Sequence, residues 1–192
     1  VLVSQFVGDI AHDSGTSKNV FAPQSMLTDA TGNAWYEMAY VGSVTDTSAF
    51  PASGCSEYLS RPCLSDTQIR AEIDAVRIAH GWPTGLDNLY ILYTAPGVDS
   101  CLGSSCSADH IPNRAFCAYH GHFLSSGEHV IYANEPGFNL GNDGCDLTPY
   151  PFGPDDVAQH PWGNDAEIAF STTSHEVTEA MTDPLVDHTG AP

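Results

Sequence analysis

The sequence predicts a single α/β domain, in which helices and a mixed β-sheet share one hydrophobic core. The chain has 192 residues, enough for one domain or at most two small ones. Hydrophobic residues make up 42% of it, as in folded globular proteins. Segments with helical spacing of apolar residues alternate with short runs rich in β-branched and aromatic residues, an order typical of α/β layers. Because no repeat or linker divides the chain, we expect residues 1–192 to form one domain.

The first third of the chain predicts one helix and one strand. Apolar residues at helical spacing predict a helix over residues 2–10 that packs against a sheet. The polar segment 13–31, interrupted by glycine and proline, predicts a loop with a short extended piece at residues 20–21. The aromatic and β-branched residues of 35–45 predict a strand. Residues 46–63 then predict a surface loop closed by a disulfide.

Capping residues identify the clearest helix of the chain. Ser65 is expected at its N-cap, with Gln68 three residues later completing a capping box. Apolar residues from Ile69 to Ile78 supply the side that faces the core, and Gly81 ends the helix. Residues 89–94 follow as a buried strand, so this part of the chain runs from helix to strand.

The C-terminal half predicts a hairpin, a long loop and a last helix. Residues 115–123 and 128–133 flank the turn sequence at 125–127 and predict an antiparallel hairpin. The proline-rich segment 135–164 is irregular, and a loop of that length in a compact domain is usually functional, for instance as the wall of a cleft. Residues 166–182 predict a helix that ends before a proline.

The charge of the chain excludes several partners. Five Lys and Arg residues oppose 24 Asp and Glu, which gives a net charge of −19. Such a surface repels phosphate, so neither nucleic acid nor an anionic membrane surface is expected as a partner. No apolar run is long enough to span a bilayer, and no membrane insertion is expected. Because Val1 is not an initiator Met, we interpret it as a processed end from which a targeting segment has been removed.

The cysteine count is even and favours disulfides in an oxidising, extracellular compartment. The six cysteines are Cys55, Cys63, Cys101, Cys106, Cys117 and Cys145. They allow 15 pairings, among which the sequence does not choose. Short loops make Cys55 with Cys63 and Cys101 with Cys106 plausible pairs, and Cys117 with Cys145 would then join a strand to a distant loop. Disulfides are preferred to metal ligation because no cysteine spacing matches a zinc pattern.

One stretch of the last helix carries the chemistry. His175 and Glu179 are four residues apart, so a helix places them on one face, one turn apart. An imidazole and a carboxylate in that arrangement reach one divalent ion, and zinc accepts both kinds of ligand. In the related His-Glu-x-x-His pattern, the residue at the position of Glu176 is the general base that activates water. The alternative is a solvated acidic helix with an incidental histidine.

Residues 174–185, Ser-His-Glu-Val-Thr-Glu-Ala-Met-Thr-Asp-Pro-Leu, resemble the signature of a family of secreted microbial zinc metallopeptidases with a His-Glu-x-x-Glu-x-x-Thr-Asp-Pro motif. More distantly, the chain is similar to the plant EXORDIUM (phosphate-induced) proteins. Further segments match the same family pattern in the same order: 5–9, 44–49, 64–66, 116–120, 132–134 and 144–146. The family signature continues further than this chain, which ends at Pro192. We therefore also consider that the chain is a processed fragment of a longer one.

The resemblance implies a zincin-like domain, with a mixed sheet packed on the motif helix and disulfide-tied loops. It implies a Zn²⁺ cofactor held by His175 and Glu179, with Glu176 as the catalytic base. A catalytic zinc needs a third protein ligand. Asp183, where the helix ends, is one candidate for it. His120, in the family-like 116–120 segment, is expected either as that ligand or as a catalytic group that stabilises the oxyanion.

Other residues are weaker candidates. His122 alternates to the same face as His120, and Asp187 and His188 follow the signature. Acidic residues of 139–146 and 155–156 offer oxygen ligands for structural Ca²⁺, although they do not match an EF-hand loop.

The expected function is that of a secreted, extracellular zinc endopeptidase, which hydrolyses peptide bonds of a protein or peptide substrate through a metal-activated water. The alternative is a non-catalytic, EXORDIUM-like extracellular binding or cell-wall-associated protein on the same scaffold. Metal content and protease assays distinguish the two.

Overall fold

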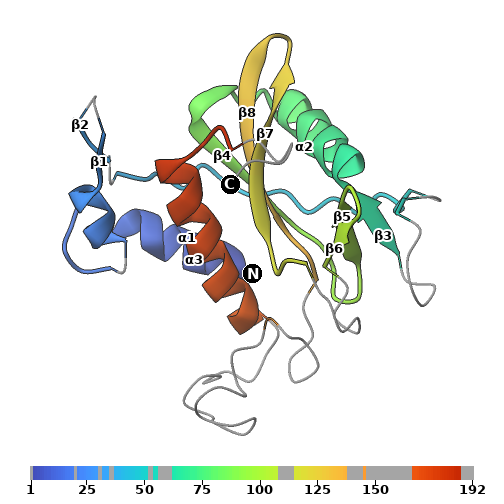
Figure 1. Cartoon of the computed structure of the whole chain (residues 1–192), viewed down its shortest axis with the longest axis horizontal. Coiled ribbons are helices and arrows are strands. Elements are labelled where there is room, and N and C mark those ends of the chain that lie inside the picture. Colours follow the sequence, from blue (N-terminus) through green and yellow to red (C-terminus); the bar gives the residue numbers. More distant parts are fainter. Residues whose placement is uncertain are drawn as a thin grey trace, which may run out of the picture.

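The computed structural model describes residues 2–19, 21–29, 32–34, 37–51, 54–55, 62–107, 115–137, 145 and 166–186. Over these residues the protein is a mixed α+β structure, as the sequence predicts (Figure 1). Its elements are α1 (Leu2–His12), the 3₁₀ helix η1 (Ala22–Met26), β1 (Thr28–Asp29), β2 (Gly32–Asn33), β3 (Cys63–Ser65), α2 (Asp66–His80), β4 (Gly85–Tyr93), β5 (Asp99–Leu102), β6 (Ser105–Cys106), β7 (Tyr119–Ser125), β8 (Glu128–Glu135) and α3 (Ala166–Thr182).

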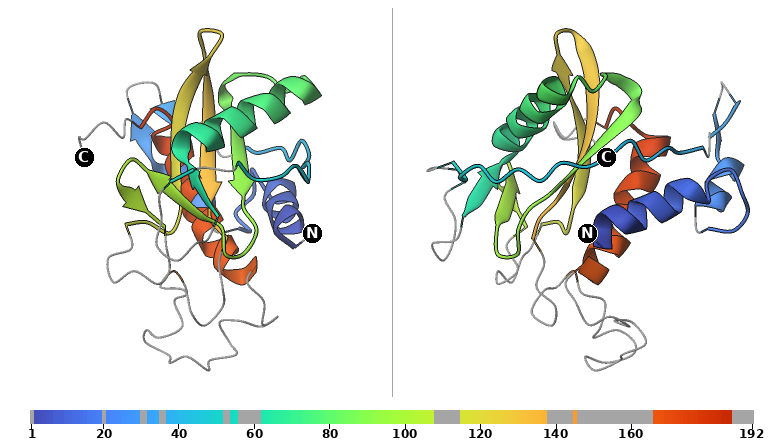
Figure 2. Two further views of the ribbon diagram at one scale, coloured as in Figure 1. Left: turned by 90° about the vertical axis from the view of Figure 1, so that its right-hand side faces the viewer. Right: turned by 180° about the vertical axis from the view of Figure 1, so that it is seen from behind.

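A three-stranded sheet in the order β4-β8-β7 forms the centre of the molecule. The predicted hairpin provides β7 and β8, which pair antiparallel across a turn where Ser126 and Gly127 both have positive φ, 53° and 88°. Such a turn matches the twist of the strands that it joins. β4 pairs parallel to β8 on the other side, so the sheet is mixed. The sheet lies between two layers, with α2 on one face and α1 and α3 on the other (Figure 2).

Side chains alternate between these two layers, because successive residues of a strand point to opposite faces. On β8, Val130 and Tyr132 pack with Ile69 and Ile73 of α2 in one core cluster. The alternate residues of β8, including Glu135, point to the face covered by α1 and α3. β8 is thus buried on both faces, which explains why its sequence does not alternate between polar and apolar residues.

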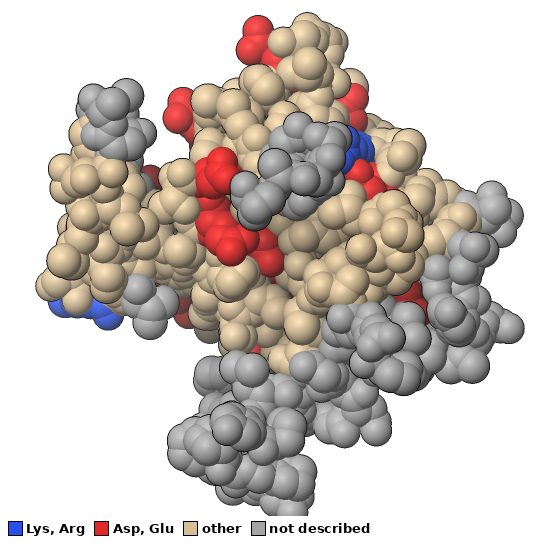
Figure 3. Space-filling model, in the orientation of Figure 1, with Lys and Arg blue, Asp and Glu red and all other residues tan. Residues whose placement is uncertain are grey.

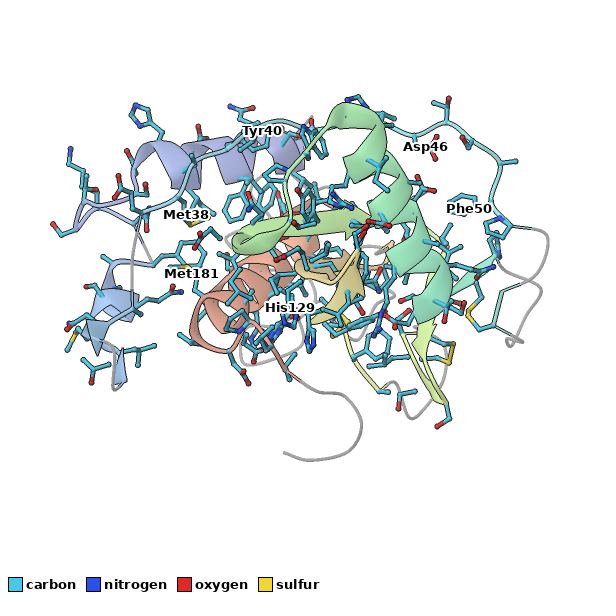
Figure 4. All side chains as sticks on the ribbon, turned by 90° about the horizontal axis from the view of Figure 1, so that it is seen from above. Met38, Tyr40, Asp46, Phe50, His129 and Met181 are labelled. Carbon is cyan, nitrogen blue, oxygen red and sulfur yellow. A yellow bond between two sulfur atoms is a disulfide. The ribbon has the colours of Figure 1, made fainter. Side chains whose placement is uncertain are left out.

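The second face is covered by α1 and α3, which pack against each other and the sheet. Ile10, Phe21 and Val177 form the buried centre of this layer. Met38 and Met181 close it from the side, and Figure 4 shows them between α1 and α3. The predicted N-terminal helix is confirmed by α1. It contacts both α3 and side chains of the sheet edge β4.

Local signals determine α2 as the sequence predicts. The Ser65 side chain accepts a hydrogen bond from the Gln68 backbone, and the Gln68 side chain accepts one from the Ser65 backbone. Gly81 ends the helix in the left-handed conformation, φ 65°, which favours glycine. Ile78, expected on the buried side, is instead 61% exposed, and Arg77 is buried because its guanidinium binds Asp74 and Ser125. The buried side of α2 therefore carries Arg77, whose guanidinium is hydrogen-bonded, and not Ile78 as expected.

A polar network lies where α2 meets the sheet. The Asp66 carboxylate accepts hydrogen bonds from Tyr119, at 2.8 Å, and Tyr132. Its other oxygen pairs with Arg70 at 2.7 Å, and the guanidinium of Arg70 also lies over the ring of Tyr132. Burial raises the pKa of both tyrosines, so each hydroxyl stays protonated and donates. This network fixes the start of α2 against β7 and β8.

Two further sequence predictions, both in the first third of the chain, are wrong. Residues 37–45 form no strand; they lie in an extended segment whose course is marked by Tyr40, Asp46 and Phe50 in Figure 4. β propensity does not make a strand unless a neighbouring edge accepts its hydrogen bonds, and Val41 is 79% exposed. Phe21 is not extended either. It precedes η1, because the proline that follows favours a helical turn. Val20, Trp35 and Tyr36 lie outside the described residues.

All six cysteines are in disulfides, and the loop-length pairing is the observed one: Cys55–Cys63, Cys101–Cys106 and Cys117–Cys145. The first two belong to a small second sheet, β3-β5-β6, and the third lies near the start of α3 with Ile168 and Ala169. Among the described helices, none is long and apolar enough to cross a membrane. Of the predicted loop 135–164, only residues 135–137 and 145 are described, and the expected calcium ligands at 139–144, 146, 155 and 156 lie outside them.

Candidate metal centre

The candidate site lies between β7 and the C-terminal half of α3. His120 is on β7, opposite Ala133 of β8, and its side chain points to the face that α3 covers. On α3, Glu176 and Glu179 are one helical turn apart and therefore lie on the same side of the helix. The strand and the helix thus bring one imidazole and two carboxylates together from segments that are far apart in the sequence.

His120 is the centre of the contacts. Its Nδ1 lies 3.4 Å from Oε2 of Glu176 and 3.3 Å from Oε2 of Glu179. Its Nε2 donates a hydrogen bond to the backbone carbonyl of Asp183 at 2.9 Å. The imidazole is buried, with only 4% of the residue exposed. Each ring nitrogen therefore has its own contacts. Nε2 binds the end of α3, and Nδ1 faces the carboxylates of Glu176 and Glu179.

The charges around His120 change its protonation. Burial by itself lowers the pKa of His120, because a cation loses water there. The close contact with Glu176 and the hydrogen bond to the Asp183 carbonyl, together with the charges of both glutamates, outweigh burial and raise the pKa above its ordinary value. In the absence of a metal ion, the raised pKa favours the protonated imidazole between the two carboxylates.

His175 is placed differently from the other motif residues. Its side chain is 66% exposed, and its Nε2 lies 2.9 Å from Oε1 of Glu179. The carboxylate of Glu179 therefore lies between two imidazoles, with one oxygen towards His175 and the other towards His120. The structure thus brings His175 and Glu179 together as their helical spacing predicts.

Asp183 reaches the site through its backbone. The residue is exposed, and its carbonyl group, not a carboxylate oxygen, contacts His120. The helix ends here with a hydrogen bond from the Asp183 amide to the Glu179 carbonyl, at 2.7 Å. Asp187 and His188 lie outside the described residues.

One buried acid near the site was not found by the sequence analysis. Glu135, at the end of β8, is 1% exposed, and its Oε2 accepts a hydrogen bond from Thr172 of α3 at 2.6 Å. Its Oε1 is buried with no hydrogen-bond partner. Burial raises the pKa of Glu135 well above its usual range, and the charge of Glu176 raises it further. Its position at the end of an apolar strand, next to a loop, is not a signal that distinguishes it from a surface acid.

The side chains of the His120 cluster, which comprises His120, Glu176 and Glu179, fit a divalent cation. Ligand atoms of His120, Glu176 and Glu179 all lie within 4.8 Å of one another. Oε2 of Glu176 is buried and makes no hydrogen bond, although Glu176 is only 3% exposed. The Nε2–H of His120 is already donated to a carbonyl, which in a neutral ring leaves the lone pair on Nδ1, where the carboxylates are. Metal-binding histidines usually have this second hydrogen bond.

The surrounding surface is acidic. Figure 3 shows one face of the molecule, on which Asp and Glu far outnumber Lys and Arg, in keeping with the net charge of −19. Such a field raises the local concentration of cations. A second group of potential ligands, Cys55, Cys63 and Cys101, consists of sulfurs that are already in disulfides.

Comparison of the chain with family models, with curated proteins and with solved structures gives no match. The site is therefore interpreted from its own geometry.

Proposed function

We propose that the protein is a zinc-dependent hydrolase that cleaves peptide bonds outside the cell. The observation that carries this proposal is the convergence of His120 of β7 with Glu176 and Glu179 of the His-Glu-x-x-Glu helix. A helix motif alone is a common coincidence, but an imidazole supplied to the same point by a distant strand is not required by the packing of the fold. A bound zinc ion would polarise the scissile carbonyl and make water acidic enough to attack at neutral pH.

His120, His175 and Glu179 are the proposed ligands. Two imidazoles and one carboxylate are a common set for catalytic zinc. The Glu179 carboxylate already lies between the two rings, 2.9 Å from His175 Nε2 and 3.3 Å from His120 Nδ1. This assignment replaces the Asp183 carboxylate as the third ligand. The Asp183 carbonyl instead holds His120 in the tautomer whose Nδ1 lone pair faces the site.

Glu176 is the proposed general base. Its carboxylate is almost fully buried beside His120, and its Oε2 has no hydrogen-bond donor, so it is able to accept a proton from water. The same carboxyl group then returns the proton to the leaving amine. Glu135 lies behind it in the core, where burial raises its pKa and so disfavours a second negative charge beside the base.

The position of the site favours an extended peptide as the substrate. β7 is an edge of the β4-β8-β7 sheet in the described part of the chain, and His120 lies on it. Extended peptides commonly bind by adding as a further strand at the edge of a sheet. Three disulfides support an oxidising, extracellular setting.

Metal content and casein hydrolysis, each measured with and without a chelator, test the proposal. We expect about one zinc per chain and hydrolysis that a chelator abolishes. Glu176→Gln should keep the metal and lose on the order of 10² to 10⁴ in rate, because the amide cannot accept a proton. His120→Ala, His175→Ala and Glu179→Ala should each lose the metal. Asp183→Ala is the matched control, because its carbonyl remains, and it should keep both metal and activity.

Two results would contradict the proposal. If Glu176→Gln empties the site, Glu176 is a metal ligand and not the general base. If the purified wild-type protein binds no zinc at micromolar concentration and hydrolyses no peptide, the His120–Glu176–Glu179 group is an ion-pair cluster, and the protein is a non-catalytic binding module.

A further inference from the structure

Two disulfides of the small second sheet are in direct contact. β3 and β5 pair in parallel, so that Cys63 lies opposite Asp99, and Ser65 lies opposite Cys101. Side chains of Cys63 and Cys101 therefore share one face of the sheet. Their sulfur atoms, which belong to different disulfides, are 3.6 Å apart. The four sulfurs thus form a continuous chain in the order Cys55, Cys63, Cys101, Cys106.

The backbone enforces this contact. At Gly54 the chain passes so close to β3 that an added Cβ would lie 1.7 Å from the carbonyl oxygen of Cys63. Glycine is therefore required there, and it seats Cys55 against the strand. On the other side, Cys101 and Cys106 are directly opposite each other in the β5–β6 hairpin.

The inner and outer sulfurs differ in burial. Cys63 and Cys101, the two in contact, are 9% and 2% exposed. Cys55 and Cys106 are partly exposed and line a cavity of about 620 Å³, together with Cys101 and the first turn of α2 at Ser65–Thr67. A small thiol therefore has better access to the outer sulfurs than to the inner ones, which are more deeply buried.

We infer that this cluster is a thiol–disulfide exchange site that accepts small thiols. The exchange replaces the Cys55–Cys63 and Cys101–Cys106 disulfides by one Cys63–Cys101 cross-link. The thiolate of the incoming molecule attacks Cys55 Sγ, the Cys55–Cys63 bond breaks, and Cys63 Sγ leaves with the electron pair. Cys63 then attacks Cys101 Sγ, the Cys101–Cys106 bond breaks, and Cys106 leaves as a thiolate that takes a proton from water. The number of disulfides is unchanged, since one now joins Cys55 to the small thiol.

Burial determines the direction of the exchange. A thiolate on Cys63 is formed in a site that excludes water, where a charge is unfavourable. Transfer of the disulfide to Cys63 and Cys101 leaves the free sulfur on Cys106, which is partly exposed, while Cys55 carries the small thiol. Thiolate reactivity depends on such exposure, so the products present their free thiol to the cavity. β3 and β5 become directly cross-linked, while β5 and β6 are released from each other.

The Cys55→Ser variant tests the second step directly, because it leaves Cys63 without its partner. Alkylation with a maleimide at neutral pH, followed by a peptide map without reduction, should find the Cys63–Cys101 disulfide. Cys106 should be labelled about tenfold more than Cys63. Cys117→Ser is the matched control: it leaves Cys145 free, and its label should stay on Cys145, with the other two disulfides unchanged. A label that stays on Cys63, with Cys101–Cys106 intact, overturns the inference.

A second measurement uses the wild-type chain, in case Cys55→Ser does not fold. The protein is treated with one equivalent of cysteamine, a cationic thiol suited to an acidic protein, then alkylated and mapped in the same way. We expect cysteamine on Cys55, the Cys63–Cys101 disulfide and an alkylated Cys106, with Cys117–Cys145 intact. If cysteamine instead reacts first with Cys117 or Cys145, or no Cys63–Cys101 species forms, the site does not exchange. Neither outcome depends on zinc or on peptide hydrolysis.

Discussion

The two faces of the β4-β8-β7 sheet bury polar groups in opposite ways. On the α2 face, the Asp66 carboxylate is saturated by two tyrosine hydroxyls and a guanidinium. On the α3 face, two glutamates share one imidazole, and buried oxygens of Glu135 and Glu176 make no hydrogen bond. Saturated networks stabilise a fold, whereas an unsatisfied buried group is costly and needs another explanation. The contrast between the Asp66 network and the His120 cluster is therefore one of hydrogen-bond saturation, and the proposed metal site would supply the partner that the Glu176 oxygen lacks.

The largest expected effect is the loss of His120. His120→Ala removes the only cation that both glutamates contact within the described residues and leaves buried Glu176 without compensation. Breaking a buried ion pair from one side typically costs about 3–5 kcal/mol. We therefore expect a strong decrease in the free energy of unfolding of the metal-free protein, measured by urea denaturation. A loss below about 1 kcal/mol would mean that the α3 face carries no uncompensated charge.

The pH dependence of stability should come from the α3 face. The pKa of Glu135 is raised in the folded protein above its ordinary value of 4.5, and that of His120 above 6.5. A raised pKa means that the folded state holds its proton more tightly. Each group therefore contributes stability that is complete below its unfolded pKa and is lost as pH rises through its folded pKa.

We expect the metal-free protein to become less stable as pH rises from about 4.5 upwards. Glu135→Gln should flatten this slope, because the amide remains neutral at every pH. Thermal unfolding from pH 4.5 to 9, followed by circular dichroism, measures it. An unchanged slope in Glu135→Gln would show that Glu135 ionises freely in the folded state.

A smaller effect is expected on the α2 face. Tyr132→Phe removes one hydroxyl from Asp66 and Arg70, but the carboxylate keeps Tyr119 and the guanidinium. A hydrogen bond to a charged group contributes about 1.5–3 kcal/mol, and the partners that remain should limit the loss to the lower end of that range. Urea denaturation measures the change, and metal content should not alter. A loss as large as that of His120→Ala would remove the difference between the two faces.

The sequence predicts the α2 face better than the α3 face, for a physical reason. The capping box at Ser65, the αL glycine and the hairpin turn are local signals, read within a few residues. The His-Glu-x-x-Glu spacing is also local, and it predicts the contact between His175 and Glu179. By contrast, the distances from His120 to two glutamates join residues more than 50 positions apart. The sequence offered His120 as a candidate, but only the packing of α3 on β7 supplies its partners.

Contacts between residues far apart in the sequence also explain the residues that the sequence did not predict or predicted wrongly. Glu135 has no spacing signal, because its partner Thr172 is on another element. The segment 37–45 has strand composition, but strand formation depends on an available edge. Arg77 is buried because Ser125 accepts from it across the fold. In each case the deciding partner is distant, while the pairing of short-loop cysteines succeeded because their partners are near.

The smallest expected effect tests whether local signals really determine α2. Ser65→Ala removes the side chain that accepts from the Gln68 amide and leaves that donor without its cap. Loss of an N-cap costs about 1 kcal/mol. Ser174→Ala on α3 is the matched control. The Ser174 hydroxyl donates back to the Phe170 carbonyl within the helix, a bond that adds little, so we expect a change within about 0.5 kcal/mol. Urea denaturation of both variants measures the difference. Equal losses would mean that the cap contributes no more to α2 than an ordinary hydroxyl contributes to α3, and that α2, like the His120 cluster, is held by tertiary packing.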